Sequence, residues 1–325
     1  MKFTIDIHDD LKDIRLDSVI SNFRKDCSRN KAAALVNTGD ILVNNKRKKP
    51  GYRVRPGDVI SGIIPDLYDD MTILPEKIPL DIAFEDDHIL VINKEPGMVV
   101  HPAPGNLSGT LVNGLLFHDP KIVGAGDDRF RSGIVHRLDK DTSGLMVVAK
   151  TKQALEFLQK EFKQRRVQKK YLALVSGNLP DDTGEINLPI GRHPVKRKIM
   201  AINHEEGKPA RTIWKVKKYY KNACLVEALL KTGRTHQIRV HFYAIDHPLI
   251  GDLVYQPRRY RKIKKKAAPR QMLHSFQLAF SHPYSGIKMF FKAELPQDFL
   301  LTLSLLESSG LVCRDKDVKN TSITS

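Results

Sequence analysis

The segment VHRLDKDTSGLMVVA, residues 135–149, most constrains the fold, because charged residues run directly into an apolar stretch. Arg137 and Asp139 are two residues apart, so on an extended segment their side chains point to the same side. The small residues 142–144 predict a turn at which one backbone can approach another closely. The run 145–149 predicts a buried strand. Placing a cation and a carboxylate beside a buried strand costs free energy unless the two groups pair or serve a function. This segment alone does not decide between a structural ion pair and a functional site.

A second segment, LKTGRTHQIRVH at residues 230–241, gathers two arginines, two histidines and a glutamine around one glycine. Read as a strand, it places Arg239 and His241 on one face and apolar neighbours on the other. His236 and His241 are five residues apart, which fits neither one face of a strand nor the i, i+4 spacing of helical zinc pairs. With no cysteine or carboxylate set nearby, we expect no metal site.

These segments resemble motifs of the RNA pseudouridine synthases of the RluA/RluD branch, and the resemblance runs from about residue 10 to about residue 300. Four stretches carry it: DHILVINKEPGMVVHP (87–102), HRLDKDTSGL (136–145), KKYLALV (169–175) and TGRTHQIRVH (232–241). Two more, GRHPVKRK (191–198) and GKPAR (207–211), resemble the RluD-type enzymes of large-subunit rRNA in particular. One departure, KEPG at 94–97 in place of the commoner Lys-Pro-x-Gly, keeps length and glycine, so we expect unchanged chemistry.

The resemblance implies an isomerase that breaks the N1–C1′ bond of a uridine, turns the base and rejoins it through C5. Nothing is added or lost, so no cofactor is implied. Asp139 would be the catalytic carboxylate, attacking the sugar or removing a sugar proton, with Asp141 as the rival. Tyr171 would stack on the base and assist proton removal. Arg239 would pair with Asp139, and Arg234 is the competing assignment.

The target base must leave its stack and enter a dry pocket, because water would intercept the detached sugar. Arg137 would fill the space that the base vacates, and His136 is expected to be a structural hydrogen-bonding residue. The expected walls of the pocket are Leu138, Leu145, Met146 and Ile238.

Composition and charge narrow the class of protein. The length of 325 residues predicts two domains. The sequence contains no run of about 18 apolar residues, so we expect no membrane span. The mixed, acidic start is unlike a signal peptide. Three widely spaced cysteines, at positions 27, 224 and 313, fit neither a disulfide framework nor a metal site and indicate a reducing cytoplasm.

The net charge of +17 is clustered. Residues 22–56 hold ten Lys/Arg against two acids, residues 157–170 six against one, and residues 256–270 eight against none. Three such clusters favour phosphate contacts over simple solvated faces, and no lipidation motif supports a membrane surface. The predicted RNA contacts are Arg15, Arg29, Lys31, Arg137, Lys169, Arg234, Arg258, Arg259 and Lys264.

The first 70 residues predict a small RNA-binding domain. Two helices, near 14–20 and 28–36, are followed by a strand at 41–44 and by a second strand that begins after a turn at 54–58. This order resembles the S-four domain of ribosomal proteins. An unrelated capping domain is the alternative.

The rest of the chain predicts an α+β catalytic domain at 81–307, with a large mixed, mainly antiparallel sheet as in the pseudouridine synthase core. The clearest helix spans 153–168. An acidic, proline-bearing linker is expected at 71–80 and a disordered tail at 308–325.

Several readings of function stay open at this point. RNA isomerisation on large-subunit rRNA is favoured, with transfer RNA as an alternative substrate. A non-catalytic ribosome-assembly factor would explain the charge but not three motif residues at Asp139, Tyr171 and Arg239. An RNA hydrolase would require a metal cluster or paired carboxylates. With no coiled-coil signal, a monomer is expected.

Overall fold

The structure is a computed structural model that describes residues 2–24, 27, 29–64, 73–102, 106–126, 131–196, 199–257 and 268–308. The chain divides into two compact units, residues 1–72 and 73–325. Within the described residues, no helix has the length and apolar character needed to cross a membrane.

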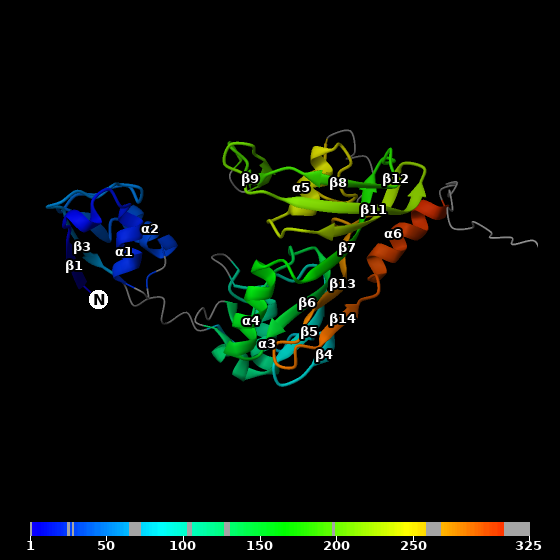
Figure 1. Ribbon diagram of the computed structural model, residues 1–325, viewed down its shortest axis with the longest axis horizontal. Helices are drawn as coiled ribbons and strands as arrows, with labels where there is room; N and C mark the ends of the chain where they lie inside the picture. The colour runs from blue at the N-terminus through cyan, green and yellow to red at the C-terminus, as the bar shows by residue number, and fades with distance from the viewer. Residues whose placement is uncertain are drawn as a thin grey trace, which may run out of the picture. The chain divides into compact units, whose positions relative to one another are not determined.

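The first unit packs two helices against a small antiparallel sheet (Figure 1). Its elements are β1 (Lys2–Asp6), η1 (Asp9–Leu11), α1 (Leu16–Phe23), α2 (Arg29–Thr38), β2 (Ile41–Val43) and β3 (Val59–Ile63), with strand order β1–β3–β2. The predicted helix–helix–strand order is confirmed, but β1 was not foreseen. This strand is short and mostly polar, and it exists through pairing with β3, from Lys2 opposite Ile63 to Asp6 opposite Val59.

The second unit is built on a nine-stranded mixed sheet, which confirms the α+β prediction (Figure 1). The strand order is β4–β5–β6–β13–β7–β12–β11–β8, with β14 also paired to β13, and only β6 and β13 run parallel. The strands are β4 (Ile82–Glu85), β5 (Ile89–Lys94), β6 (Ser143–Ala149), β7 (Gln168–Ser176), β8 (Thr183–Asn187), β9 (Ile190–Arg192), β10 (Met200–Ile202), β11 (Arg211–Tyr220), β12 (Ala223–Leu230), β13 (Leu273–Ser281) and β14 (Lys288–Lys292). The helices are α3 (Leu111–His118), η3 (Pro120–Ala125), α4 (Lys152–Lys163), α5 (Gln237–Ala244) and α6 (Gln297–Ser308), and β9 and β10 form a separate ribbon.

The sheet is covered on both faces at β5 and β6, which explains the continuous apolar run of 145–149. Alternate residues of these strands pack with α4 on one face, through Leu158, and with α3 on the other, through Leu115. A strand buried on both faces needs apolar side chains at every position. The predicted buried strand is therefore confirmed as β6.

Strand β13 joins the two halves of the sheet and brings distant segments together. Ser275 lies opposite Gly144 of β6 on one side and opposite Tyr171 of β7 on the other. The turn before β6 and the first half of β7 therefore face the same region, although they are about 30 residues apart in sequence.

Gly144 allows this arrangement: the predicted close approach of two backbones is confirmed, although Ser143 and Gly144 lie in β6 rather than in a turn. Its φ is +112°, and a Cβ there would lie 2.6 Å from the main-chain N of Ser275 and closer still to its carbonyl oxygen. No larger residue fits without moving the two strands apart.

One predicted helix is confirmed but ends earlier than expected, and one predicted strand is wrong. The helix expected at 153–168 ends at Lys163, because Arg165 has a left-handed φ of 59° and Gln168 already begins β7. The strand read through Arg239 and His241 is the helix α5. Residues 237–242 are all buried, and polar and apolar side chains alternate along them, so the sequence shows the period of a strand rather than that of a helix.

The linker prediction also needs correction for residues 73–80. Ile78 and Leu80 pack against α3 at Gly114, and the Asn113 side chain donates a hydrogen bond to the Leu74 carbonyl at 2.8 Å. The apolar residues of 73–80, which are interspersed with prolines and charged residues, thus pack this segment against the catalytic unit. Residues 71–72 and 309–325, which include most of the predicted tail, lie outside the described residues.

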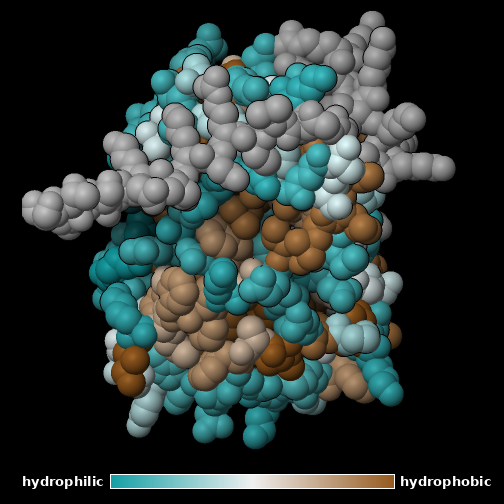
Figure 2. All heavy atoms as spheres, turned by 90° about the vertical axis from the view of Figure 1, so that its right-hand side faces the viewer, coloured by the Kyte–Doolittle hydropathy of each residue, from teal (hydrophilic) through white to brown (hydrophobic). Residues whose placement is uncertain are grey.

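Figure 2 shows a face of the molecule on which apolar side chains gather among polar ones. On α6, Leu300, Leu301 and Leu305 are exposed, whereas Phe299 is fully buried against the sheet. The inner side of α6 therefore packs on the sheet and stabilises the unit. The three leucines on its outer side remain in contact with solvent.

The packing at Gly144 predicts a large loss of stability for Gly144→Ala. Strain at positive φ together with a main-chain clash should lower the free energy of unfolding by roughly 3 kcal/mol or more. Gly286→Ala is the matched control, since Gly286 has a φ of +71° but nothing within 4 Å of the added Cβ. Urea unfolding followed by fluorescence of Trp214, the single tryptophan, measures both. Equal losses in the two variants would contradict the close approach.

Candidate active site

Three consecutive carbonyls in the turn that carries Asp139 are held by hydrogen bonds. The Asp139 carbonyl accepts from the Thr142 N–H at 3.0 Å. The Lys140 carbonyl accepts from the Lys94 Nζ at 3.0 Å, and the Asp141 carbonyl from Nη1 of Arg270 at 2.9 Å. Two buried cations thus fix the backbone on which the carboxylate is mounted.

Neither cation was assigned to the site from the sequence. Lys94 lies in the first motif and also donates to the carbonyls of Glu95 and Met98, at 2.7 and 3.0 Å. Burial, together with the charge of Arg270, lowers the pKa of Lys94 to about 7. Arg270 belongs to the basic run that was expected to grip RNA, but it is buried and paired with Asp298 at 2.7 Å. That expectation is wrong for Arg270, because a buried guanidinium cannot reach a phosphate.

The ion pair expected between Asp139 and Arg239 is present. Nη1 of Arg239 donates to Oδ2 of Asp139 at 2.9 Å. A second carboxylate, Asp252, binds the same guanidinium through Nε at 2.6 Å and Nη2 at 3.1 Å. The side chains of Asp252, Arg239 and Asp139 are 0%, 6% and 19% exposed, so the chain of charges runs outward from the interior to the site.

Asp252 orients Arg239 and was missed by sequence reasoning. One of its oxygens also accepts from the N–H groups of Val254 and Tyr255, at 2.8 and 3.0 Å. Burial alone would lower the pKa of Arg239, but the two carboxylates outweigh it and raise that pKa above its usual value. Nothing in the local sequence around Asp252 distinguishes it from a surface loop aspartate.

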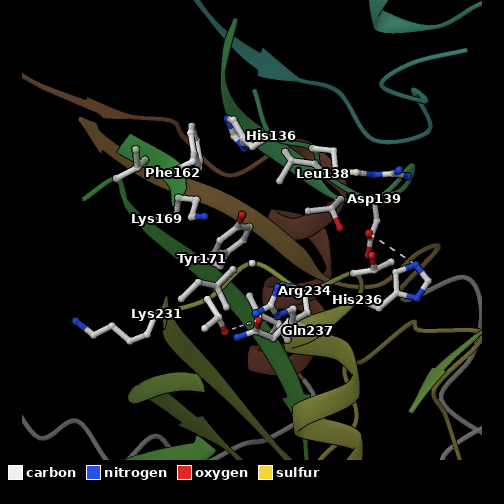
Figure 3. A pocket seen from close by; sticks show the side chains of 18 of the residues that line it. His136, Leu138, Asp139, Phe162, Lys169, Tyr171, Lys231, Arg234, His236 and Gln237 are labelled. Atoms are coloured by element: carbon white, nitrogen blue, oxygen red, sulfur yellow. Dashed lines mark hydrogen bonds and ion pairs between the residues drawn. The ribbon is translucent and has the colours of Figure 1, made fainter. Parts of the chain in front are cut away.

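The Asp139 side chain lines a cavity of about 510 Å³, which Figure 3 shows with its lining side chains. The structure brings most predicted site residues to this cavity: Arg137, Leu138, Asp139, Lys169, Tyr171, Arg234, Ile238 and Arg239. Arg137 and Asp139 reach it from a loop before β6.

Three residues weighed at the sequence level do not line the cavity. Asp141 is absent from the lining, which separates it from its rival Asp139. Leu145 and Met146 are wrong as walls, because both are fully buried within β6, where the sheet and its covering helices enclose them. Apolar walls come instead from Phe162, Val167 and Leu273.

Tyr171 lies on β7 with its ring almost fully buried, facing the same cavity as Asp139 (Figure 3). Burial, with a smaller contribution from the negative charge of Asp139, raises the pKa of Tyr171. The hydroxyl therefore carries its proton at neutral pH and can donate it to a ligand.

His136 has the structural role that was predicted. Its Nε2 accepts a hydrogen bond from the Val147 N–H at 3.1 Å, and its ring stacks on Phe162 at 4.7 Å. Burial lowers the pKa of His136 to about 3, so the ring stays neutral. The Lys169 ammonium also lies over the Phe162 ring, 4.9 Å from its centroid.

Arg234, the competing candidate for the ion pair, also lines the cavity but is directed to the backbone. Its Nε donates to the Pro209 carbonyl at 3.1 Å. Of the two arginines weighed for the ion pair, Arg239 is the one placed to make it.

In the first unit, Arg15 and Arg29 flank the buried Asp17, at 2.7 and 3.3 Å, and their side chains remain exposed. Lys31 is half-buried on α2. A separate concave surface is lined by Arg15, Arg47, Lys48, Lys49, Pro50, Gly51 and Tyr52. The predicted contacts Arg258, Arg259 and Lys264 lie outside the described residues.

Comparisons with known proteins agree with this geometry. The sequence signature described as RNA pseudouridylate synthase matches residues 88–244, and that of the S4 domain matches residues 14–60. The chain is 42% identical over 298 residues to ribosomal large subunit pseudouridine synthase D of Neisseria meningitidis serogroup B, covering 90% of this chain and 78% of the relative. The chain belongs to the RNA pseudouridine synthase family.

Further relatives support the same assignment. The protein of the same name from Nitrosomonas europaea is 41% identical over 305 residues, covering 93% of this chain and 87% of the relative. The solved structure of human RNA pseudouridylate synthase domain containing 1 is similar, with a TM-score of 0.54, 28% identity and coverage of 72% of this chain and 96% of that chain. This RNA pseudouridine synthase is therefore an isomerase acting on RNA, and the readings as a non-catalytic factor or a hydrolase are set aside.

The doubly bound Arg239 predicts that Asp252→Ala strongly destabilises the synthase. Removing one partner of a buried ion pair leaves an uncompensated charge and should lower the free energy of unfolding by roughly 3–5 kcal/mol. Glu185→Ala is the control, since Glu185 makes an equally short pair with Arg211 on the surface, at 2.6 and 2.7 Å, and should change stability little. Urea unfolding measured by Trp214 fluorescence compares the two, and similar losses would contradict the role given to Asp252.

Proposed function

We propose that this synthase isomerises uridines of large-subunit rRNA, with Asp139 as the catalytic carboxylate. The observation that carries the chemistry is the position of Asp139, half-buried at a cavity and bound to Arg239 at 2.9 Å. The substrate is supported by relatives at 41–42% identity that are named large-subunit synthases, and by the segments 191–198 and 207–211.

Asp139 acts at the sugar of a flipped uridine. Arg239 binds its Oδ2 and orients the carboxylate, because a charge-assisted hydrogen bond fixes the position of both groups. The carboxylate then bonds to C1′ as the N1–C1′ bond breaks, or takes a C2′ proton to give a glycal. The base turns, and C5 bonds to C1′ as the bond between Asp139 and C1′ breaks or, on the glycal route, as the C2′ proton returns from Asp139. The C5 proton leaves and N1 gains a proton, so the atoms of substrate and product balance.

Tyr171 and the pocket walls hold the base. The buried ring of Tyr171 offers a face for stacking, and its protonated hydroxyl offers a donor, while Leu138 and Ile238 exclude water. Arg137, exposed at the edge of the cavity, fills the gap left in the RNA. Lys169 and Arg234 line the cavity and contact the RNA backbone.

The N-terminal residues 1–70 grip RNA through Arg15, Arg29, Lys31 and the basic concave surface, while residues 81–307 carry the chemistry. The region 258–264, with Arg258, Arg259 and Lys264, extends this grip to the stem of a loop substrate. Loop uridines suit the reaction because they cost less to flip than paired ones. We place the monomeric enzyme in the cytoplasm, where ribosomal subunits assemble.

Asp139→Asn should abolish turnover while RNA binding stays within a few-fold. The assay is release of tritium from uridine labelled at C5, with the strand remaining intact. Asp141→Asn is the matched control, two residues away and outside the cavity lining, and should keep most activity. Substantial release by Asp139→Asn would contradict the assignment.

Lys48 and Lys49 should contribute to RNA affinity rather than to chemistry. Replacing both by Ala should reduce the slope of log affinity against log salt by about 0.7–0.9 for each phosphate that the protein no longer neutralises, with kcat unchanged at saturating RNA. Lys215→Ala with Lys217→Ala, exposed on β11, removes the same charge elsewhere. An equal change of slope in both pairs would show that only net charge matters.

The substrate assignment is tested in cells. Mapping pseudouridines with and without this gene should reveal losses in a loop of large-subunit rRNA and none elsewhere. Loss of transfer RNA sites with unchanged rRNA would leave the reaction standing and overturn the substrate.

A further inference from the structure

His236 faces the end of Asp139 that Arg239 leaves open. Its ring lies beside Asp139 (Figure 3), with Nε2 3.7 Å from Oδ1 of that residue. Arg239 binds the other oxygen, Oδ2. His236 lines the cavity and precedes α5 with φ of 57° and ψ of 21°, a left-handed conformation that is strained for a residue other than glycine. The fold thus holds this ring at Asp139 at a conformational cost.

Tyr255 determines which nitrogen of His236 carries the proton. The Tyr255 hydroxyl oxygen accepts a hydrogen bond from the Met200 N–H at 2.9 Å and lies 2.7 Å from Nδ1 of His236. A hydroxyl has one proton to donate, and the N–H of Met200 cannot accept it. Among the described residues, Nδ1 of His236 is the acceptor that lies within hydrogen-bonding distance of this hydroxyl. Tyr255 therefore donates to Nδ1, and the proton of the neutral imidazole is on Nε2, which points at Asp139.

Burial keeps the His236 ring neutral. Burial lowers its pKa, and the positive charges of Arg239 and Arg137 add to this, against the opposite effect of Asp139 and Asp252. Tyr255 is itself buried, and burial raises its pKa, so its hydroxyl retains the proton that it donates. The same Tyr255 ring lies under the Arg239 guanidinium, 5.0 Å from its centroid.

We propose that His236, held by Tyr255 in the Nε2–H tautomer, is a positioning residue that donates to Oδ1 of Asp139 while Arg239 donates to Oδ2. This rests on the proposed catalytic role of Asp139. At 3.7 Å, Nε2 of His236 is directed at Oδ1 of Asp139 but does not yet form a hydrogen bond with it, since such a bond requires about 3.2 Å or less. The contact closes when the flipped uridine displaces water from the cavity, and two donors then fix the plane of the carboxylate against the sugar.

The first test is spectroscopic and does not depend on activity. Nitrogen NMR of the full chain labelled at histidine should show a protonated Nε2 and an unprotonated Nδ1 for His236. Tyr255→Phe keeps the ring beneath Arg239 and removes only the hydroxyl, so it should convert this signal to a mixture of tautomers. Tyr243→Phe is the control, because its ring packs beside Tyr255 at 6.2 Å, and it should leave the signal unchanged. A protonated Nδ1 in the parent protein would overturn the proposal.

The second test is kinetic. His236→Leu should lower kcat for tritium release by roughly 100-fold with KM within about two-fold, the size expected when a reacting group is deprived of one donor. His236→Gln, which keeps an N–H at similar reach, should recover most of that loss, and Tyr255→Phe should fall by roughly 10-fold. Trp214 fluorescence confirms that each variant is folded.

Asp139→Asn measured in parallel separates the two levels of the argument. If Asp139→Asn is inactive and His236→Leu retains the parent kcat, the positioning role is wrong and the proposed function stands. If Asp139→Asn is active, the proposed function itself fails. A loss in His236→Leu that His236→Gln does not recover would indicate a packing role and also overturn the proposal.

Discussion

A single buried guanidinium connects the interior of the catalytic unit to its reactive edge. Arg239 binds the fully buried Asp252 with two hydrogen bonds and the half-buried Asp139 with one. The inner carboxylate orients the arginine, and the arginine holds the outer carboxylate at the cavity through a charge-assisted hydrogen bond. Most other features of the unit can be understood as placing these three side chains in line.

The backbone that carries Asp139 is positioned by the sheet and by two further buried cations. The close approach of Gly144 to Ser275 sets β6 beside β13, and the pairing of Ser275 with Tyr171 sets β7 on the other side. Lys94 and Arg270 then bind the carbonyls of the turn itself. Rigid elements thus support a short loop, an arrangement that suits a site whose geometry must hold within fractions of an ångström.

Sequence reasoning identified the part of the site that lies in contiguous motifs. Asp139, Tyr171, the pairing of Asp139 with Arg239, and the buried strand β6 follow from local pattern and family resemblance. Asp252 and Arg270 did not, because their roles depend on burial and on contacts outside their own segment, with Arg239 for Asp252 and with the Asp141 carbonyl for Arg270. The helix α5 was read as a strand since polar and apolar residues alternate along its buried part, 237–242, and β1 was missed since its pairing with β3 comes from residues more than 50 positions away. Where long-range packing decides, residue pattern alone is insufficient.

The central claim is that Asp139, held by Arg239, acts at the sugar of a flipped uridine. A structure of the full chain with an RNA stem-loop carrying 5-fluorouridine at the target tests it most directly, because fluorine replaces the proton that must leave C5. The account predicts an oxygen of Asp139 bonded to C1′ or within about 3.5 Å of C1′ or C2′, with Arg239 still bound to both Asp139 and Asp252. A sugar that lies nearest to Asp141 or another carboxylate, or an Arg239 that has left Asp139, would contradict it.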